Sequence, residues 1–301
     1  MPASARPVDK ESLEHYLAAS SHSPTAMRLV LGNLLRKMRK QAGIEAEAAG
    51  RHIGGSEAKI SRLERGNVAC KEPDVMDLLA LYGVRDEQVL ACFAQMVDLS
   101  RRSGWWQRYD GVLPDWFGKL IGLQEAASVI RTYEVQLVPG LLQTADYARA
   151  VTRLGYPLAA QEEIDARVEL RMDRRALLTR NEAPHLWAIL DEAALSRPVG
   201  GEHVMRAQVG HLVDMARLPN VRVQIAPLNE PRCAVAGFPI THLRFDLPDL
   251  PDIIYLEQLG NADYLDKPEQ VEHYRSVLDT LSMASLSPKE SFHLLENALR
   301  Y

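Results

Sequence analysis

The chain has 301 residues, of which 47% are hydrophobic and 25% are charged, a composition typical of a globular protein with room for two domains. No run of 18 apolar residues occurs and residues 1–10 are polar, so we expect neither a transmembrane helix nor a secretory signal. The three cysteines, Cys70, Cys92 and Cys233, are far apart and form neither a metal-binding spacing nor a disulfide framework, which suits a reducing cytoplasm.

The formal net charge of −5 conceals an asymmetry along the chain. Residues 27–71 carry ten Lys and Arg against four Glu, a net of +6 that leaves −11 for the remainder. A basic N-terminal block on an acidic body is typical of a DNA-binding segment joined to a domain that does not bind nucleic acid. A solvated basic helix face gives a similar count, so the charge alone does not distinguish it from a DNA-binding segment.

Residues 1–26 read as an N-terminal extension with a short helix at 11–19 and a Ser- and Pro-containing break at 20–24. The next segment, 27–84, contains two short helices joined by a glycine turn. The first is expected at 45–53, and Gly54 and Gly55 end it because glycine readily adopts the left-handed conformation. Ser56 then caps a second helix, which ends at Gly66. This is the layout of a DNA-binding helix-turn-helix, and the alternative is an ordinary helical hairpin at the surface.

The two faces of the second helix support DNA binding. Ile60 and Leu63 share an apolar face, whereas the opposite face is polar. We expect Arg62 to read a base, with guanine as its best partner. The full set of expected DNA-binding residues is Ser56, Glu57, Ala58, Lys59, Ser61, Arg62 and Arg65. Within this set, Glu57 and Ala58 are assigned to base edges, and Lys59 and Arg65 to phosphates.

The run Ser61-Arg62-Leu63-Glu64-Arg65-Gly66, with 31–43 upstream and 78–84 downstream, resembles the Xre-type helix-turn-helix regulators. That resemblance implies a five-helix repressor-like bundle that binds double-stranded DNA. It also implies a structural ion pair beneath the DNA-binding surface, for which the matching residues are Arg39 and Glu64.

Residues 85–110 are expected to form a connecting helix at 86–102 and an aromatic loop whose two tryptophans either seal an interface or pack locally. We expect residues 111–301 to form one α+β domain, with helices around a small β-sheet, that also dimerises. The whole chain is then mainly α. The expected helices are 115–133, 144–154, 161–180, 202–217, 268–284 and 288–299. The expected strands are 185–190, 221–226, 239–245 and 253–257.

Several segments of the C-terminal domain resemble the WhiJ-like class, in which such a domain is fused to an Xre-type regulator, mainly in actinomycetes. The most specific is Val138-Pro139-Gly140-Leu141-Leu142-Gln143-Thr144 with the helix that follows, and the others are 167–175, 218–225 and 254–257. The resemblance implies transcriptional control, often together with a small partner protein encoded nearby in an antitoxin-like arrangement.

No catalytic motif stands out in residues 111–301: there is no His-Glu-x-x-His, no Gly-x-Ser-x-Gly and no phosphate loop. We therefore expect a domain that binds without catalysing and that needs no metal or cofactor. Glu257 ends an apolar strand, where a carboxylate either binds a ligand or is simply solvated.

Three arginines of the C-terminal domain, Arg167, Arg171 and Arg174, share one helix face. They could bind an anionic effector, an acidic partner or DNA backbone, but pairing with acidic neighbours such as Glu163 is a simpler account. In a different segment, the apolar turn at 139–142 and Tyr147 on the helix that follows could meet a partner protein, or Leu141 and Leu142 could belong to the core.

Together these features predict a sequence-specific DNA-binding transcriptional regulator of the cytoplasm. It would act as a homodimer whose C-terminal domain binds a partner protein or a small-molecule effector, with no membrane involvement. The alternative is an antitoxin-type module that neutralises a small partner protein and autoregulates its own operon.

Overall fold

A computed structural model describes residues 10–19, 23–247 and 249–299. The chain divides into two compact units. The first extends to Trp105 and includes the short segment Asp246–Pro251, and the second comprises Trp106–Phe245 and the residues from Asp252 onward. Residues 1–9 and 20–22, which belong to the expected N-terminal extension and its break, lie outside the described residues.

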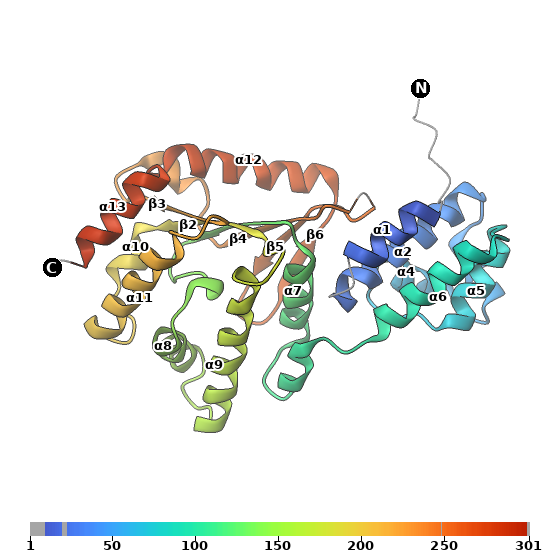
Figure 1. Ribbon diagram of the computed structural model, residues 1–301, viewed down its shortest axis with the longest axis horizontal. Coiled ribbons are helices and arrows are strands. Elements are labelled where there is room, and N and C mark those ends of the chain that lie inside the picture. Colours follow the sequence, from blue (N-terminus) through green and yellow to red (C-terminus); the bar gives the residue numbers. More distant parts are fainter. Residues whose placement is uncertain (1–9, 20–22, 248, 300–301) are drawn as a thin grey trace. The chain divides into compact units, whose positions relative to one another are not determined.

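The first unit is helical (Figure 1). Its helices are α1 (Lys10–Ala19), α2 (Pro24–Gln41), α3 (Ala46–His52), α4 (Glu57–Glu64), α5 (Glu72–Leu81) and α6 (Glu87–Arg101). The central helix, α2, begins where the Ser23 hydroxyl accepts a hydrogen bond from the Ala26 amide at 3.1 Å, with Pro24 in the first turn. The apolar side of α2 is buried along its length, through Met27, Val30, Leu31, Leu34, Leu35 and Met38.

The helices at 10–19 and 87–101 belong to this unit rather than standing apart as an extension and a linker. On α6, Phe93 and Met96 are fully buried, and on α1 Leu13 is fully buried. Their apolar faces thus complete the core of the helical unit. The compact unit is therefore larger than the 27–84 segment expected from the sequence.

The segment Asp246–Pro251 joins two strands of the second unit, yet it is part of the helical unit. Asp249 holds it there. Lys37 on α2 forms an ion pair with the Asp249 carboxylate at 3.1 Å, and the Asn33 side chain donates to the Asp249 carbonyl at 2.9 Å. The Tyr16 hydroxyl also donates to the Asp249 carboxylate. Nothing in the local sequence of this segment indicates such a role.

The second unit is built on a six-stranded sheet in the order β3-β2-β1-β4-β5-β6. β1 pairs in parallel with β2, and β2 with β3, whereas β4, β5 and β6 extend the sheet with antiparallel pairing. The strands are β1 (Val129–Glu134), β2 (His185–Asp191), β3 (Val221–Ala226), β4 (Ile240–Arg244), β5 (Ile253–Glu257) and β6 (Ala262–Leu265). The helices are α7 (Asp115–Ala126), α8 (Ala145–Gly155), α9 (Gln161–Arg175), α10 (Glu192–Ser196), α11 (Glu202–Met215), α12 (Pro268–Ala284) and α13 (Pro288–Ala298).

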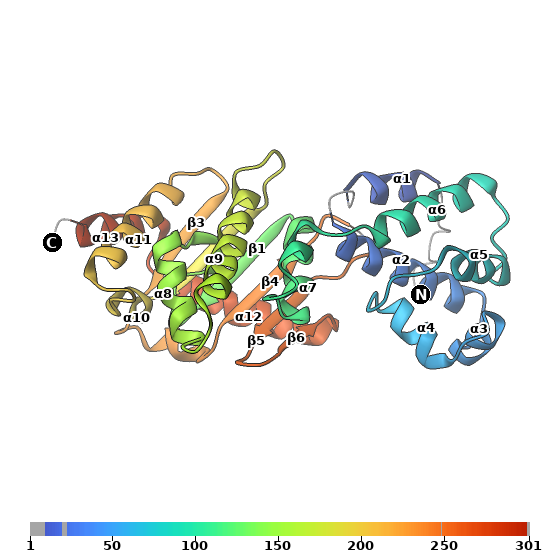
Figure 2. The same cartoon turned by 90° about the horizontal axis from the view of Figure 1, so that it is seen from below.

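Helices cover both faces of this sheet. α12 lies on one face, where Val271, Leu278 and Leu281 pack against Tyr133 and Ile254. α7, α8 and α9 lie on the opposite face (Figures 1 and 2). The expected fold class, a helical N-terminal bundle followed by helices around a β-sheet, is confirmed.

Two expectations for the second unit are wrong. The helix expected over 115–133 ends at Ala126, and Val129–Glu134 is instead the central strand β1. Strand β6 was not expected at all. A strand that pairs on both sides, as β1 does, gains ladder hydrogen bonds that outweigh the local helical pattern.

The specific Pro-Gly-Leu-Leu-Gln-Thr segment forms a buried turn ahead of α8. Leu141 and Leu142 are 4% and 0% exposed and Tyr147 is 0% exposed, so they are core residues and cannot meet a partner at the surface. Gln208 fixes the turn, because its side chain donates a hydrogen bond to the Leu142 carbonyl and accepts one from the Thr144 amide, both at 2.7 Å. This correction removes Tyr147 from the candidate partner surface.

Candidate nucleic-acid interface

The segment between α3 and α4 has the geometry of a tight helix-helix turn. Gly54 has a φ of +60°, a conformation that favours glycine. Ser56 is extended, and its hydroxyl accepts a hydrogen bond from the Lys59 amide at 3.3 Å, which caps α4. A Cβ on Gly50 would lie 2.6 Å from the carbonyl carbon of Ser56, so only glycine lets α3 approach the start of α4 this closely.

The inner face of α4 anchors it to the helical core. Ile60 and Leu63 are 1% and 3% exposed. Gly32 on α2 allows the backbones to touch, since a Cβ there would lie 2.5 Å from the Leu63 carbonyl oxygen. Backbone-to-backbone contact of this kind fixes the position of α4, and therefore the direction in which its outer face points.

The outer face of α4 is polar and open to solvent. Glu57, Ala58, Arg62 and Arg65 are exposed, and so is the capping Ser56. Ser61, also expected to bind DNA, is half-buried on this helix. Within the described part of the chain, the Arg62 guanidinium makes no hydrogen bond or ion pair that would hold it away from a ligand. A free guanidinium on a rigid exposed helix can bond a guanine edge bidentately.

The two expected phosphate contacts differ from Arg62. Lys59 forms an ion pair with Asp74 of α5 at 2.7 Å and is half-buried. A phosphate contact by Lys59 would therefore compete with this pair, which ties α4 to α5. Arg65 is exposed but folds back on its own helix, with its Nε donating to the Ser61 carbonyl at 3.0 Å. Asp74 was not singled out in the sequence because its partner is distant in the chain.

Arg39 and Glu64, the residues paired on the strength of the family resemblance, are joined by two hydrogen bonds of 2.5 and 2.9 Å. Arg39 also donates to the Ile44 carbonyl at 2.8 Å. Their side chains are only 10% and 8% exposed. The hydrogen bond to Glu64 raises the pKa of Arg39. The pair thus links the end of α2 to the end of α4 beneath the polar face.

In the second unit, the three arginines of the α9 face have different environments. Arg167 forms a bidentate pair with Glu163, at 3.0 and 2.8 Å, and its guanidinium lies 3.8 Å from the centre of the Tyr156 ring. The simpler explanation, a salt bridge along the helix, therefore holds for Arg167. Arg171 is half-buried and Arg174 is only 6% exposed, so neither belongs to an open charged surface.

The charge of Glu257 on β5 acts to raise the pKa of Arg171 and of Arg174, and the charge of Glu134 on β1 acts on Arg171 in the same way. Burial, reinforced by the nearby Glu257 carboxylate, raises the pKa of Glu134 at the end of β1 to about 8. Glu257, at the end of β5, is exposed and accepts a hydrogen bond from the Tyr255 hydroxyl at 2.8 Å. The sequence pattern predicts a helix up to residue 133, so it gives no sign that Glu134 ends a strand of the sheet.

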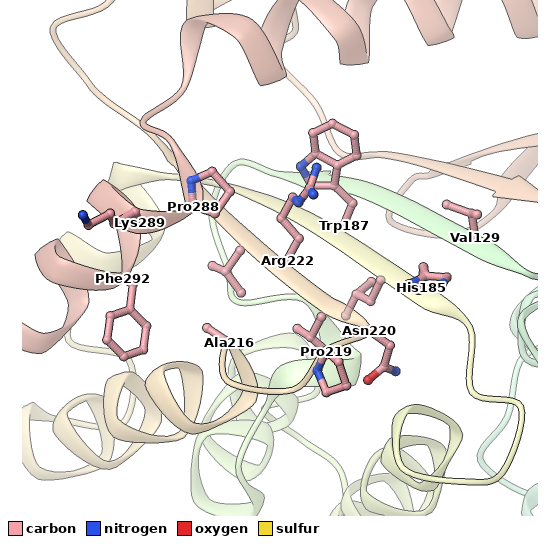
Figure 3. Close-up of a pocket in the computed structure, with 13 residues that line it drawn as sticks. Val129, His185, Trp187, Ala216, Pro219, Asn220, Arg222, Pro288, Lys289 and Phe292 are labelled. Atoms are coloured by element: carbon pink, nitrogen blue, oxygen red, sulfur yellow. The ribbon is translucent and has the colours of Figure 1, made fainter.

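A pocket of about 590 Å³ lies beside the edge strand β3 (Figure 3). His185, Trp187, Arg222 and Phe292 are among its lining residues. The Arg222 guanidinium lies 4.8 Å from the centre of the Trp187 ring, so the aromatic face is already occupied by a cation.

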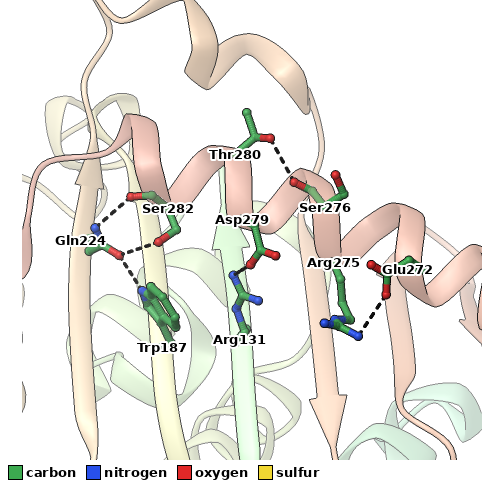
Figure 4. Close-up of polar contacts among 9 residues, drawn as sticks. All are labelled: Arg131, Trp187, Gln224, Glu272, Arg275, Ser276, Asp279, Thr280 and Ser282. Atoms are coloured by element: carbon green, nitrogen blue, oxygen red, sulfur yellow. Dashed lines mark hydrogen bonds and ion pairs between the residues drawn. The ribbon is translucent and has the colours of Figure 1, made fainter.

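Several polar groups next to this pocket are paired (Figure 4). The Trp187 indole N–H donates to Gln224 at 2.6 Å, and the Gln224 amide donates to the Ser282 and Leu286 carbonyls. Arg131 pairs with Asp279 of α12 at 2.7 Å. These contacts fasten α12 to the sheet.

Each of the two parts of the chain matches a known protein family. Residues 117–297 match the family described as a domain of unknown function (DUF5753), and residues 30–91 match a helix-turn-helix domain. No curated protein and no solved structure matches the chain. No helix within the described residues is long and apolar enough to cross a bilayer.

Proposed function

Because the chain belongs to the DUF5753 family and carries a helix-turn-helix domain ahead of it, we propose that it is a sequence-specific transcriptional regulator with a binding domain at its C-terminus. The observation that carries the proposal is the capped helix α4, which exposes Arg62 and Arg65 while Ile60 and Leu63 anchor its other face. Docked in a major groove, Arg62 reads a base and Arg65 contacts phosphate.

The regulator acts as a homodimer in this proposal. One helix-turn-helix contacts only a short half-site, and two copies about one helical turn apart, roughly 34 Å, double the contacts. The C-terminal unit is the proposed dimerisation part, because it is the larger of the two and a two-fold interface needs ample apolar surface. In this proposal the C-terminal unit binds a partner protein or a small effector without catalysis, and the protein works in the cytoplasm.

Selection of bound duplexes from a random DNA library by the full chain tests the proposal. Enrichment of a near-palindromic sequence with half-sites about one helical turn apart is expected. Light scattering of the same preparation should report a dimer. Failure to enrich any sequence would contradict the regulator, and a monomer bound to a single half-site would remove the dimer. Capture of a small protein that releases the chain from DNA would favour the antitoxin-type alternative.

A further inference from the structure

The guanidinium groups of Arg171 and Arg174 converge beside one glycine of the buried turn before α8. The position of a Cβ on Gly140 would lie 3.5 Å from Nη1 of Arg174 and 3.6 Å from Nη1 of Arg171. Gly140 precedes Leu141 and Leu142, and Gln208 fixes that turn. The most specific motif of the C-terminal unit therefore positions a small residue against two neighbouring positive charges.

Within the described part of the chain neither guanidinium forms an ion pair or hydrogen bond with a carboxylate, although the charge of Glu257 acts to raise the pKa of both and that of Glu134 acts to raise the pKa of Arg171. Among the described residues, the side-chain hydrogen bonds of both guanidinium groups go to neutral amides: Arg171 to Gln143 at 3.4 Å and Arg174 to Gln124 at 3.0 Å. The Nε of Arg174 is buried and lacks a hydrogen-bond partner in the same part of the chain. By contrast, Arg167 on the same helix has a carboxylate partner, Glu163.

The two positive charges disfavour each other. Burial, and next the charge of Arg171, lowers the pKa of Arg174 to about 10. Burial also lowers the pKa of Arg171. Buried cations are normally paired, because transfer out of water is costly without a counter-charge. An anion placed between the two groups would remove this cost, and two guanidinium forks suit the planar or tetrahedral oxygens of carboxylate and phosphate.

Charged and polar side chains of the sheet act electrostatically on the two arginines. Tyr255 and Tyr264 are register partners on β5 and β6, and the Tyr255 hydroxyl donates to Glu257. Glu134 and Glu257 stand at the carboxyl ends of β1 and β5, which run in the same direction, and Glu257 is exposed to solvent. The carboxylate of Glu257 is an acceptor for a hydroxyl or amino group on the ligand.

We infer that Arg171 and Arg174, with Glu257 at the entrance, bind a small metabolite through its carboxylate or phosphate group. The inference rests on the proposed function in one respect: the metabolite is the effector of the regulator. Arg171 and Arg174 hold the anionic group beside Gly140, and Glu257 accepts a hydrogen bond from the remainder of the molecule.

Calorimetric titration of the full chain with succinate and with inorganic phosphate, at matched ionic strength, tests the site. Arg171→Gln should weaken binding of the anion at least about tenfold, which corresponds to about 1.4 kcal/mol. Arg167→Gln is the matched control, because that residue lies one turn away and is already paired with Glu163. It should bind the anion as the wild type does. A response to succinate but not phosphate, or the reverse, identifies which anionic group the ligand carries.

Absence of heat and of any melting-temperature shift with both anions would overturn the inference, and so would equal binding by Arg171→Gln. Phosphate stabilises many folded proteins without a specific site, so the difference between the two variants is the decisive quantity. A wild type that selects no DNA sequence yet binds the anion would refute the proposed regulator and leave the anion site standing.

Discussion

Replacing Glu64 with Gln should destabilise the helical unit strongly. The substitution keeps the shape of the side chain but removes its charge and turns an N–H₂ group toward the Arg39 guanidinium, which has donors only. Both side chains are nearly buried, at 10% and 8% exposed, and Arg39 would keep its bond to the Ile44 carbonyl and one bond to the amide oxygen of the new glutamine. Loss of one partner of a buried pair costs about 3–5 kcal/mol. Because Arg39 retains part of its hydrogen bonding and both side chains are slightly exposed, we expect a loss near the lower end of that range, at about 3 kcal/mol.

Urea unfolding of the full chain, followed by far-ultraviolet circular dichroism, measures this loss. Glu47→Gln is the matched control, because Glu47 pairs with Arg51 at 2.6 Å while both side chains are about two-thirds exposed. An exposed pair four residues apart on a helix contributes about 0.3–0.5 kcal/mol, so the control should hardly move the midpoint. If Glu64→Gln and Glu47→Gln shift the midpoint equally, the buried pair does not hold α2 and α4 together and the reasoning is wrong.

Two further predictions concern the turn and the sheet. Gly50→Ala should lower the free energy of unfolding by about 1–3 kcal/mol through a backbone clash with Ser56, although alanine is the better helix former by about 1 kcal/mol. Gly111→Ala is the control, because no atom lies within 4 Å of the position of its Cβ. Equal denaturant midpoints for the two variants would contradict the close approach of α3 to the start of α4. The raised pKa of Glu134, about 8, means that the folded chain keeps a proton that the unfolded chain releases, so this group should lower stability as pH rises from about 5 to about 8. Glu134→Gln should flatten that decline in urea titrations at several pH values, and an unchanged slope would show that Glu134 is ionised in the folded chain.

Much of the fold follows from local patterns in the sequence. The bounds of α12, β3 and β5 coincide with those expected, because each has a clear period and a Pro, Asn or Gly at its border. β1 was missed because its preceding helix, α7, carries an apolar pattern that runs on into Val129 and Ile130. Only the pairing with β2 and β4, which join it from far along the chain, makes that segment a strand.

In the candidate sites, too, some features follow from the local sequence and others depend on contacts with distant residues. The cap at Ser56, the turn at Gly54 and the polar side of α4 are local features, and the sequence indicates all of them. The pairing of Lys59 with Asp74 is not local, and it could not be read from the helix that carries Lys59.

The arginine face of α9 is another example. Helical spacing places Arg167, Arg171 and Arg174 on one side, but spacing does not tell which of them the sheet buries. The meeting of Arg171 with Gly140 depends on the packing of a turn from a different part of the chain.

The affinity of the Arg62→Ala variant for the selected DNA sequence tests the central claim most directly. Fluorescence anisotropy with the full chain should show a loss of about 1–3 kcal/mol and a relaxed preference at one position of each half-site. Arg51→Ala removes an arginine that already pairs with Glu47 on α3, and it should keep the preference. Unchanged affinity and unchanged preference in Arg62→Ala would contradict the assignment of α4 as the helix that reads DNA.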